Sequence, residues 1–222
     1  MRIWAADNPK ASLMQRKRVA IVDAARLAFL ETGYAQTSMD SIATAAGVSV
    51  KTVYRHFDNK DDLFSAVMQA ACSPNGFDNL DDGQQVPAQQ PERAWFSKPP
   101  RVAFVAAGVD YLQHVLSKEQ LALYRVVTRD AHRFPDLGRR YHEEVVEQRN
   151  AFLVRYLNRW APSEKWKIKD SRRAANAFAS LLRAGIFEDA LHGIHEPTEA
   201  EIATHARMAA HSMQVLLKAG AL

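Results

Sequence analysis

The chain has 222 residues, of which 47% are apolar and 24% charged, and its formal net charge is +4 at pH 7. These values predict a soluble globular protein with one large or two modest domains. No stretch approaches the run of about 18 apolar residues that a membrane helix needs, and no apolar signal core precedes the first charges. We therefore expect a cytoplasmic protein. The single cysteine, Cys72, excludes an internal disulfide and hence a secreted, cross-linked scaffold.

The positive charge is concentrated near the start of the chain. Between Lys10 and Lys60, eight basic residues stand against four acidic ones, so this stretch holds the whole formal excess. A local excess of this kind is typical of a surface that binds a polyanion.

The first two expected helices show apolar residues at helical spacing. In "RKRVAIVDAARLAFLETGY" the apolar stripe runs from Ile21 to Phe29, and we expect the helix to stop at Gly33. Thr37, followed three places later by Asp40, predicts a capping box that opens a short second helix.

A tight turn and a third helix follow. Gly47 ends the second helix, Val48 fills the corner, and Ser49 caps the segment "VKTVYRHF", so the pair is a helix-turn-helix. On a helical wheel, Val53 points inward while Lys51 and Arg55 point nearly opposite. These outward donors suit phosphates and base edges in a major groove, although a solvated helix face would look the same.

The fourth helix begins with a charge in an unfavourable place. Asn59 or Asp58 caps it, and Lys60 then occupies the first position, where the helix dipole disfavours a cation. A DNA phosphate bound beside Lys60 would remove this conflict.

The segment "TSMDSIATAAGVSVKTVYRHFDNKDDLFSAV" resembles the DNA-binding domain of the TetR/AcrR family of bacterial transcription regulators, and the resemblance covers roughly Arg16 to Ala71. It implies phosphate contacts from four residues, Thr37, Tyr54, His56 and Lys60. It implies base-edge contacts from Val50, Lys51 and Thr52, while Ser49 and Arg55 could serve either purpose.

We expect four segments along the chain. Residues 1–14 form a flexible arm, 15–72 the helix-turn-helix domain, 73–100 a Pro- and Gly-rich loop or linker, and 101–222 a second, all-helical domain. Arg16, Lys17 and Arg18, next to the arm, could contact DNA or lie in solvent. Trp95 and Phe96 could anchor the loop to the body or cover a pocket, and anchoring is the preferred interpretation.

The second domain is expected to contain five helices, within residues 102–117, 118–137, 138–161, 170–193 and 198–220. Its segment "LYRVVTRDAHRFPDLGRRYHEE" resembles, more loosely, the C-terminal domains of an AefR-like branch of the family. The resemblance implies a homodimer formed by the last two helices, and its candidate residues are Leu181, Leu182, Gly185, Ile186, Ala206 and Met213. From the residues alone, such a stripe is more often internal core. However, a short helix-turn-helix usually gains affinity for DNA by presenting two copies to two half-sites, and this favours a dimer interface over internal core.

An effector pocket is expected inside this domain, because ligand sites are mostly apolar with a few placed polar groups. The candidates are Phe104, Tyr111, His114, Tyr124, Arg125, Thr128, His132, Phe152 and Phe178. No catalytic residue, cofactor or metal is predicted, because the sequence has no phosphate-binding loop and no nucleophile elbow. His192 and His195 lack a third ligand nearby.

These patterns together predict an all-α protein: an N-terminal three-helix DNA-binding domain followed by a helical effector-binding and dimerisation domain. The function that fits them is a homodimeric repressor released from double-stranded operator DNA by a small-molecule effector. Two alternatives stay open. A regulator of the same fold could respond to a protein partner or to no ligand, or a helical binding protein or enzyme could carry a vestigial helix-turn-helix.

Overall fold

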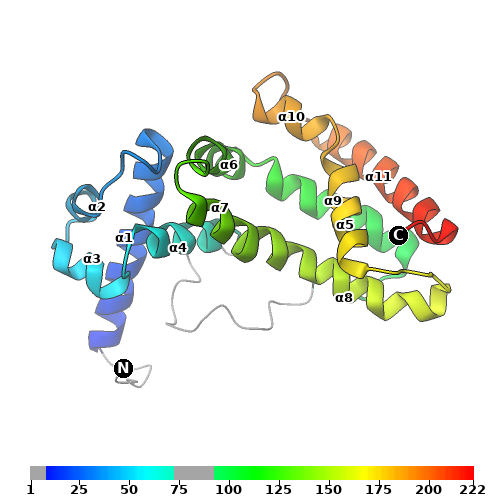
Figure 1. The fold of residues 1–222 in the computed structure, drawn as a ribbon, viewed down its shortest axis with the longest axis horizontal. Helices are drawn as coiled ribbons and strands as arrows, with labels where there is room; N and C mark the ends of the chain where they lie inside the picture. The colour runs from blue at the N-terminus through cyan, green and yellow to red at the C-terminus, as the bar shows by residue number, and fades with distance from the viewer. Residues whose placement is uncertain (1–8, 73–92) are drawn as a thin grey trace. The chain divides into compact units, whose positions relative to one another are not determined.

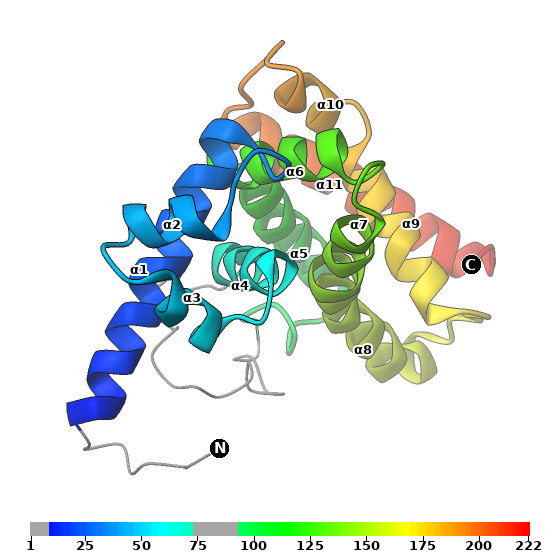
Figure 2. The same ribbon diagram turned by 60° about the vertical axis from the view of Figure 1, so that its left-hand side comes forward.

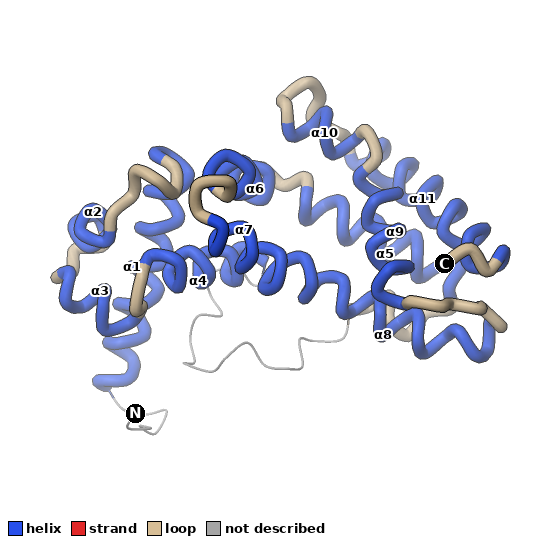
Figure 3. The backbone as a smooth tube through the Cα atoms, viewed as in Figure 1, coloured by secondary structure: helices blue, strands red, loops and turns tan. Residues whose placement is uncertain are grey.

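The structure is a computed structural model that describes residues 9–72 and 93–222. Every regular element in these two ranges is a helix, as Figure 3 shows, which confirms the all-α prediction. None of these helices is long and apolar enough to cross a membrane. The chain divides into two compact units. The first contains the beginning of the chain and residues 122–145, and the second contains residues 88–121 and 146–222.

The first unit begins with four helices, which Figures 1 and 2 show in blue to cyan. They are α1 (Pro9–Thr32), α2 (Met39–Ala45), α3 (Val50–His56) and α4 (Lys60–Cys72). It also holds most of α6 (Lys118–Asp130), α7 (Pro135–Tyr141) and nearly all of a π-helical turn, His142–Val146. The predicted domain of residues 15–72 therefore packs with residues 122–145, which the sequence pattern predicts as part of the second domain.

Helix α1 starts earlier than expected. Because it begins at Pro9, residues 9–14 of the predicted arm are helical, and only residues 1–8 lie outside the described part. Its stripe is confirmed, since Ile21, Ala25 and Phe29 are fully buried. The helix ends at Thr32, and Gly33 follows with a φ of +86°, a conformation that glycine adopts without strain.

The capping box at α2 lies one residue later than predicted. The cap is Ser38, whose hydroxyl accepts from the Ser41 amide at 3.0 Å, while the Ser41 hydroxyl accepts from the Ser38 amide at 3.1 Å. Thr37 cannot serve as the cap because its side chain turns inward, and its hydroxyl donates to the Gly33 carbonyl at 2.7 Å.

The turn between α2 and α3 is confirmed. Gly47 has a φ of +64°, Val48 packs against the core, and the Ser49 hydroxyl accepts from the Thr52 amide at 3.2 Å. Both views show α2 and α3 side by side next to α1. The fully buried Val53 fixes the inner face of α3.

The second unit contains α5 (Pro100–Val115), α8 (Glu147–Glu164), α9 (Ser171–Arg183), α10 (Ile186–Leu191) and α11 (Glu199–Ala219), as well as the first residues of α6. Helix α5 packs along α11 at Gly108, where an added Cβ would lie 3.1 Å from the Ala206 Cβ. The aromatic core of this unit consists of Phe104, Tyr156, Trp166 and Phe178.

Two expected helices are interrupted. The segment predicted as one helix over 118–137 ends as α6 at Asp130, and α7 begins only at Pro135. The segment over 138–161 is helical throughout, although it passes from α7 through the π-helical turn into α8. The segment over 170–193 breaks at Ala184 and Gly185, where Gly185 has a φ of +78°, before α10 begins. A helix cannot continue through a residue with this backbone conformation.

The beginning of the second unit confirms the anchoring role of two aromatic residues. Trp95 and Phe96 are buried, and their rings lie 5.7 and 5.9 Å from the Tyr156 ring. Most of the predicted loop, residues 73–92, lies outside the described part.

The turn conformation gives a testable prediction. Gly47→Ala should lower the free energy of unfolding by about 1–2 kcal/mol, because an alanine at positive φ is strained even where its Cβ meets open space. Urea unfolding of the purified chain measures this change. Gly47→Asn is the matched control and should lose less, since asparagine tolerates the left-handed region. Equal stability of Gly47→Ala and the unsubstituted chain would contradict the assigned turn.

Candidate nucleic-acid interface

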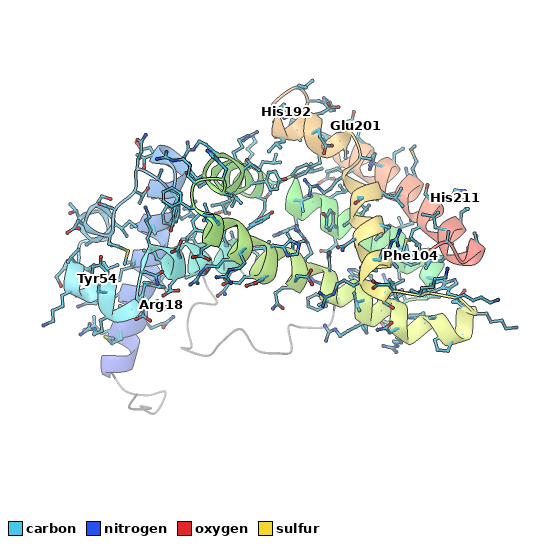
Figure 4. The ribbon with its side chains drawn as sticks, in the orientation of Figure 1. Arg18, Tyr54, Phe104, His192, Glu201 and His211 are labelled. Atoms are coloured by element: carbon cyan, nitrogen blue, oxygen red, sulfur yellow. The ribbon has the colours of Figure 1, made fainter. Side chains whose placement is uncertain are left out.

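The outer face of α3 carries donors that the fold does not use. Lys51 and Arg55 are exposed, and Tyr54 is 51% exposed (Figure 4). Within the described residues, neither an ion pair nor a hydrogen bond joins these three side chains to the rest of the chain. An ammonium, a guanidinium and a phenol are therefore available to a ligand from one short helix.

The first residues of α3 are partly engaged in local contacts. The Ser49 and Thr52 hydroxyls lie 2.8 Å apart and stabilise the start of the helix, although Ser49 is exposed. Val50 and Thr52 are half-buried, and Val50 packs against the core of the first unit. A ligand at this end of α3 could contact only the exposed parts of the Val50 and Thr52 side chains.

Thr37 does not belong to the surface. It is only 4% exposed, and its hydroxyl is bonded to the Gly33 carbonyl and lies 3.0 Å from the Thr32 hydroxyl. The phosphate contact that the resemblance implied for this side chain therefore does not fit the structure, because the hydroxyl is turned into the core.

His56 lies at the end of α3, half-buried beside α1. Its Nε2 is buried without a hydrogen-bond partner in the described residues. Burial and the positive charges of Arg18, Arg55 and Lys17 lower the pKa of His56, so the ring is neutral at pH 7. His56 could therefore bind a phosphate only through its other ring nitrogen, Nδ1.

Arg18 belongs to the packed end of α3 rather than to a free arm. Its guanidinium lies 4.4 Å from the centre of the Phe57 ring and donates to the His56 carbonyl at 3.4 Å. Burial lowers its pKa. Arg16 is exposed and donates to the Ser12 hydroxyl at 3.4 Å, so it remains a candidate for a DNA contact.

The structure gives Lys60 an intramolecular role. Asn59 caps α4, accepting from the Asp62 amide at 2.9 Å. The Lys60 ammonium turns back and donates to the carbonyls of Tyr34 and Thr37 at 2.8 and 2.9 Å. It also lies 4.4 Å from the centre of the Tyr34 ring.

These contacts explain a cation at the start of a helix without DNA. Burial lowers the pKa of Lys60, while Asp61 and Asp130 oppose that shift. The phosphate contact of Lys60 stays a prediction, and a phosphate would compete with two carbonyls for the ammonium.

Asp130, the last residue of α6, binds the loop between α1 and α2, the same loop whose carbonyls accept from Lys60. It is 4% exposed, and its Oδ2 accepts from the amides of Tyr34 and Ala35 at 2.9 and 3.2 Å. Burial alone would raise the pKa of Asp130, but the hydrogen bond and charge of Arg129 and the two amides outweigh it, so the pKa lies below its ordinary value. Sequence reasoning missed Asp130 because its partners lie almost a hundred residues away.

The residues proposed for an effector pocket do not form one set. Tyr124, Arg125, Thr128 and His132 belong to the first unit, and the other five belong to the second. Phe104 (Figure 4) and Phe178 are core residues, since they are at most 2% exposed and their rings pack at 5.3 Å. Tyr111, His114 and Phe152 are half-buried and accessible.

A shallow polar hollow lies within the first unit, and Arg18, His56 and Arg140 are among its lining residues. None of the predicted pocket residues lines it.

The predicted dimer residues also separate into two groups. Leu182, Ala206 and Met213 are at most 1% exposed within the chain, so their assignment to an outer face is wrong. Leu182 on α9 and Ala206 on α11 both lie against Gly108 of α5, so these positions are internal. Leu181 and Ile186 are half-buried and Gly185 is exposed, so these three remain candidates.

His195, which follows α10, contacts the first turn of α11. His195 Nε2 lies 3.0 Å from Glu201 Oε1, and the Glu201 carboxylate completes the capping box of α11 with Thr198. Figure 4 labels His192 and Glu201 in this region. No group of three metal-ligating side chains occurs among residues 9–72 and 93–222.

Family models identify both parts of the chain. The model described as bacterial regulatory proteins of the tetR family matches residues 21–67, and the model of the AefR-like transcriptional repressor C-terminal domain matches residues 103–216, half of the chain. The chain belongs to the TetR family. It is a DNA-binding transcriptional regulator, and α2 and α3 are its helix-turn-helix.

Curated relatives match this TetR-family chain over part of its length. TtgR of Pseudomonas putida is 39% identical over 56 residues, which are 25% of this chain and 27% of TtgR. The transcriptional activator FasR of Mycolicibacterium smegmatis is 33% identical over 113 residues, 50% of this chain and 48% of FasR. The chain thus spans between about a quarter and a half of the length of these two relatives.

Solved structures match over nearly the whole length. The flavonoid-responsive regulator FrrA is 29% identical, with a TM-score of 0.71 over 92% of this chain and 96% of FrrA. A TetR-family regulator from Mesorhizobium loti is 23% identical, with a TM-score of 0.70 over 91% of this chain and 97% of that protein. The second likeness shows the fold alone.

The buried carboxylate leads to a prediction. Asp130→Asn should lower the free energy of unfolding by about 1–3 kcal/mol, because hydrogen bonds to a charged acceptor are replaced by weaker ones. Since the folded-state pKa of Asp130 is lowered, its stabilising contribution is present above about pH 5 and is lost as the pH falls through that pKa.

Urea unfolding of both chains from pH 7 to pH 3 measures the effect. The difference between the original chain and Asp130→Asn should shrink toward the acid end. A difference that stays constant with pH would show that the carboxylate is not ionised in this contact. Asp136→Asn, at an exposed position on α7, is the control and should have little effect.

Proposed function

We propose that the chain is a homodimeric repressor that binds a palindromic operator through α3 and is released by a small-molecule effector in the cytoplasm. The observation that carries the proposal is the set of unengaged donors, Lys51, Tyr54 and Arg55, on the outer face of a helix held rigidly from behind. This function requires no catalytic residue, metal or cofactor.

The chemistry of α3 suits the major groove of double-stranded DNA. Lysine and arginine donate to the acceptors on the guanine edge, and a phenol hydroxyl donates to phosphate. Lys51 and Arg55 lie four residues apart and so project from the same side of α3. We assign base contacts to Lys51, Thr52 and the edge of Val50, phosphate contacts to Tyr54, and either role to Ser49 and Arg55.

A second copy of the chain is proposed because α3 is short. Seven residues reach only a few base pairs, and regulators of this kind gain affinity by placing two recognition helices on half-sites one helical turn apart. The outer face of α11 offers an apolar surface for such a dimer. Met208 is 65% exposed and Val215 is 52% exposed, and they lie two turns apart.

The proposal of effector release draws on the family and on one relative. FrrA, which matches nearly the whole chain, is described as flavonoid-responsive. An effector can release DNA only if it binds the DNA-free state better than the bound state. The half-buried polar and aromatic residues of the second unit are where we expect it to bind.

Selection of binding sites from random duplex DNA tests the function directly. The chain should enrich a palindrome, and Lys51→Ala should lose preference at a few bases of each half-site, at roughly 1–3 kcal/mol per good contact. Tyr54→Phe is the comparison variant and should weaken binding to all sequences alike, because phosphate contacts carry no direct sequence information.

Two results would contradict this assignment. Weak binding that depends only on salt, with no enriched sequence, would overturn the operator-specific regulator. Identical behaviour of Lys51→Ala and Tyr54→Phe would show that the contacts are sorted wrongly.

The dimer surface is tested by Val215→Glu. A charge at the centre of a buried apolar interface is costly, so this variant should be monomeric by light scattering and should bind the selected operator at least tenfold more weakly. Gln148→Glu, at an exposed position on α8, is the control and should leave the dimer intact. A dimeric Val215→Glu of undiminished affinity would place the interface elsewhere.

A further inference from the structure

A cluster of cationic and aromatic side chains joins α5 and α8 within the second unit. The Arg149 guanidinium lies 5.0 Å from the centre of the Tyr111 ring, and the Phe104 and Tyr156 rings lie 5.8 Å apart. Phe104 precedes Tyr111 by seven residues on α5, whereas its partner Tyr156 follows Arg149 by seven residues on α8. Helices α5 and α8 are therefore antiparallel here, and Arg149 lies two turns away from the aromatic core.

Among the described residues, no acidic group pairs with Arg149. Its Nε is buried without a hydrogen-bond partner, and no carboxylate in residues 9–72 or 93–222 forms an ion pair with it. The nearby Arg93 differs, because it pairs with Asp110 at 3.1 Å. Arg149 is half-buried, and a buried donor that lacks an acceptor costs free energy, so a ligand oxygen that accepts from Nε would stabilise this side chain.

A neutral histidine on α5 lies near Arg149. His114 lies one turn after Tyr111 on α5, and burial together with the charges of Arg149 and Arg93 lowers its pKa to about 4, although Asp110 opposes the shift. The imidazole is therefore neutral at pH 7. It adds no charge of its own, and it offers one ring N–H as a donor.

Aromatic surface lies beside this cation. Phe152 follows Arg149 by one turn on α8 and is half-buried. The exposed Arg155 covers its ring at 4.7 Å, and Arg93 lies 5.9 Å from the same ring. An incoming molecule would thus meet the Arg149 guanidinium beside a ring from which only the exposed Arg155 side chain would have to move.

We propose that Arg149 binds the carboxylate of a small organic acid, with Tyr111 and His114 beside the carboxylate. The apolar body of the acid would lie against the Phe152 ring in place of the exposed Arg155 side chain. A planar guanidinium matches a carboxylate with two parallel hydrogen bonds, and a single unpaired cation suits a monoanion. That this acid is the effector rests on the proposed function. The binding site itself does not depend on it.

The test measures the unfolding temperature of the full chain at pH 7 and constant ionic strength. The probes are benzoate, phenylacetate and octanoate, each compared with its neutral amide. At least one acid should raise the unfolding temperature by about 4 °C at ten times its dissociation constant, and its amide should not. Arg149→Met should lose this response, while Arg101→Met, at an exposed position on α5, should keep it.

The variant without ligand gives a second readout. Arg149→Met should unfold at a higher temperature than the original chain, because methionine retains the aliphatic packing and removes the unpaired cation. A lower unfolding temperature would show that Arg149 has a structural partner and would overturn the proposal. So would acids that stabilise no better than their amides, or that stabilise Arg149→Met equally.

Operator binding, measured in parallel, separates this proposal from the proposed function. Intact operator binding with no response to any acid would overturn the acid site alone. An acid that binds through Arg149 and weakens operator binding would support both the site and its role as the effector site.

Discussion

The loop between α1 and α2 is the point on which the DNA-binding unit depends. Two charged side chains from distant parts of the chain hold it: Asp130 accepts its amides, and Lys60 donates to its carbonyls. Tyr34, in the middle of the loop, packs against Phe29, Phe64 and Phe134, and its phenol donates to Asp61. Burial and this hydrogen bond raise the pKa of Tyr34 far above its ordinary value, so the phenol stays protonated and remains a donor.

This constraint explains how a very short helix can act as a recognition element. Seven residues are too few to form a stable helix in isolation, so α3 depends on its neighbours. Val53 anchors it to the core, Ser49 caps one end, and Arg18 bonds to the carbonyl of His56 at the other. Because the backbone and inner face are fixed in this way, the side chains of Lys51, Tyr54 and Arg55 remain free for DNA.

Local features of the fold could be predicted from the sequence, because their causes lie within a few residues. The stripe of α1, the left-handed turn at Gly47 and the caps at Ser49 and Asn59 all follow from residue type and spacing. The role of Lys60 could not be predicted, since its carbonyl acceptors lie more than twenty residues away. The sequence shows a cation at an unfavourable position at the start of α4, and the hydrogen bonds from Lys60 to these carbonyls explain it.

The candidate sites show the same limit. An apolar stripe on α11 has the same periodicity whether it faces a neighbouring helix or a second copy, and Ala206 and Met213 prove to be internal. The pocket candidates fall into both units because residue type carries no information on which helix packs where. Arg149 was overlooked because an arginine on a helix usually lies in solvent, and only the surrounding structure reveals that it is unpaired.

Hydroxyl-radical footprinting of the chain on a duplex that carries its selected site tests the central claim most directly. Two copies of α3 on successive half-sites should protect two patches on one face of the duplex, with centres about 34 Å apart, or about 10 base pairs. The protection should disappear on a duplex with scrambled half-sites. A single protected patch, or protection that ignores the sequence, would contradict a dimeric, operator-specific regulator.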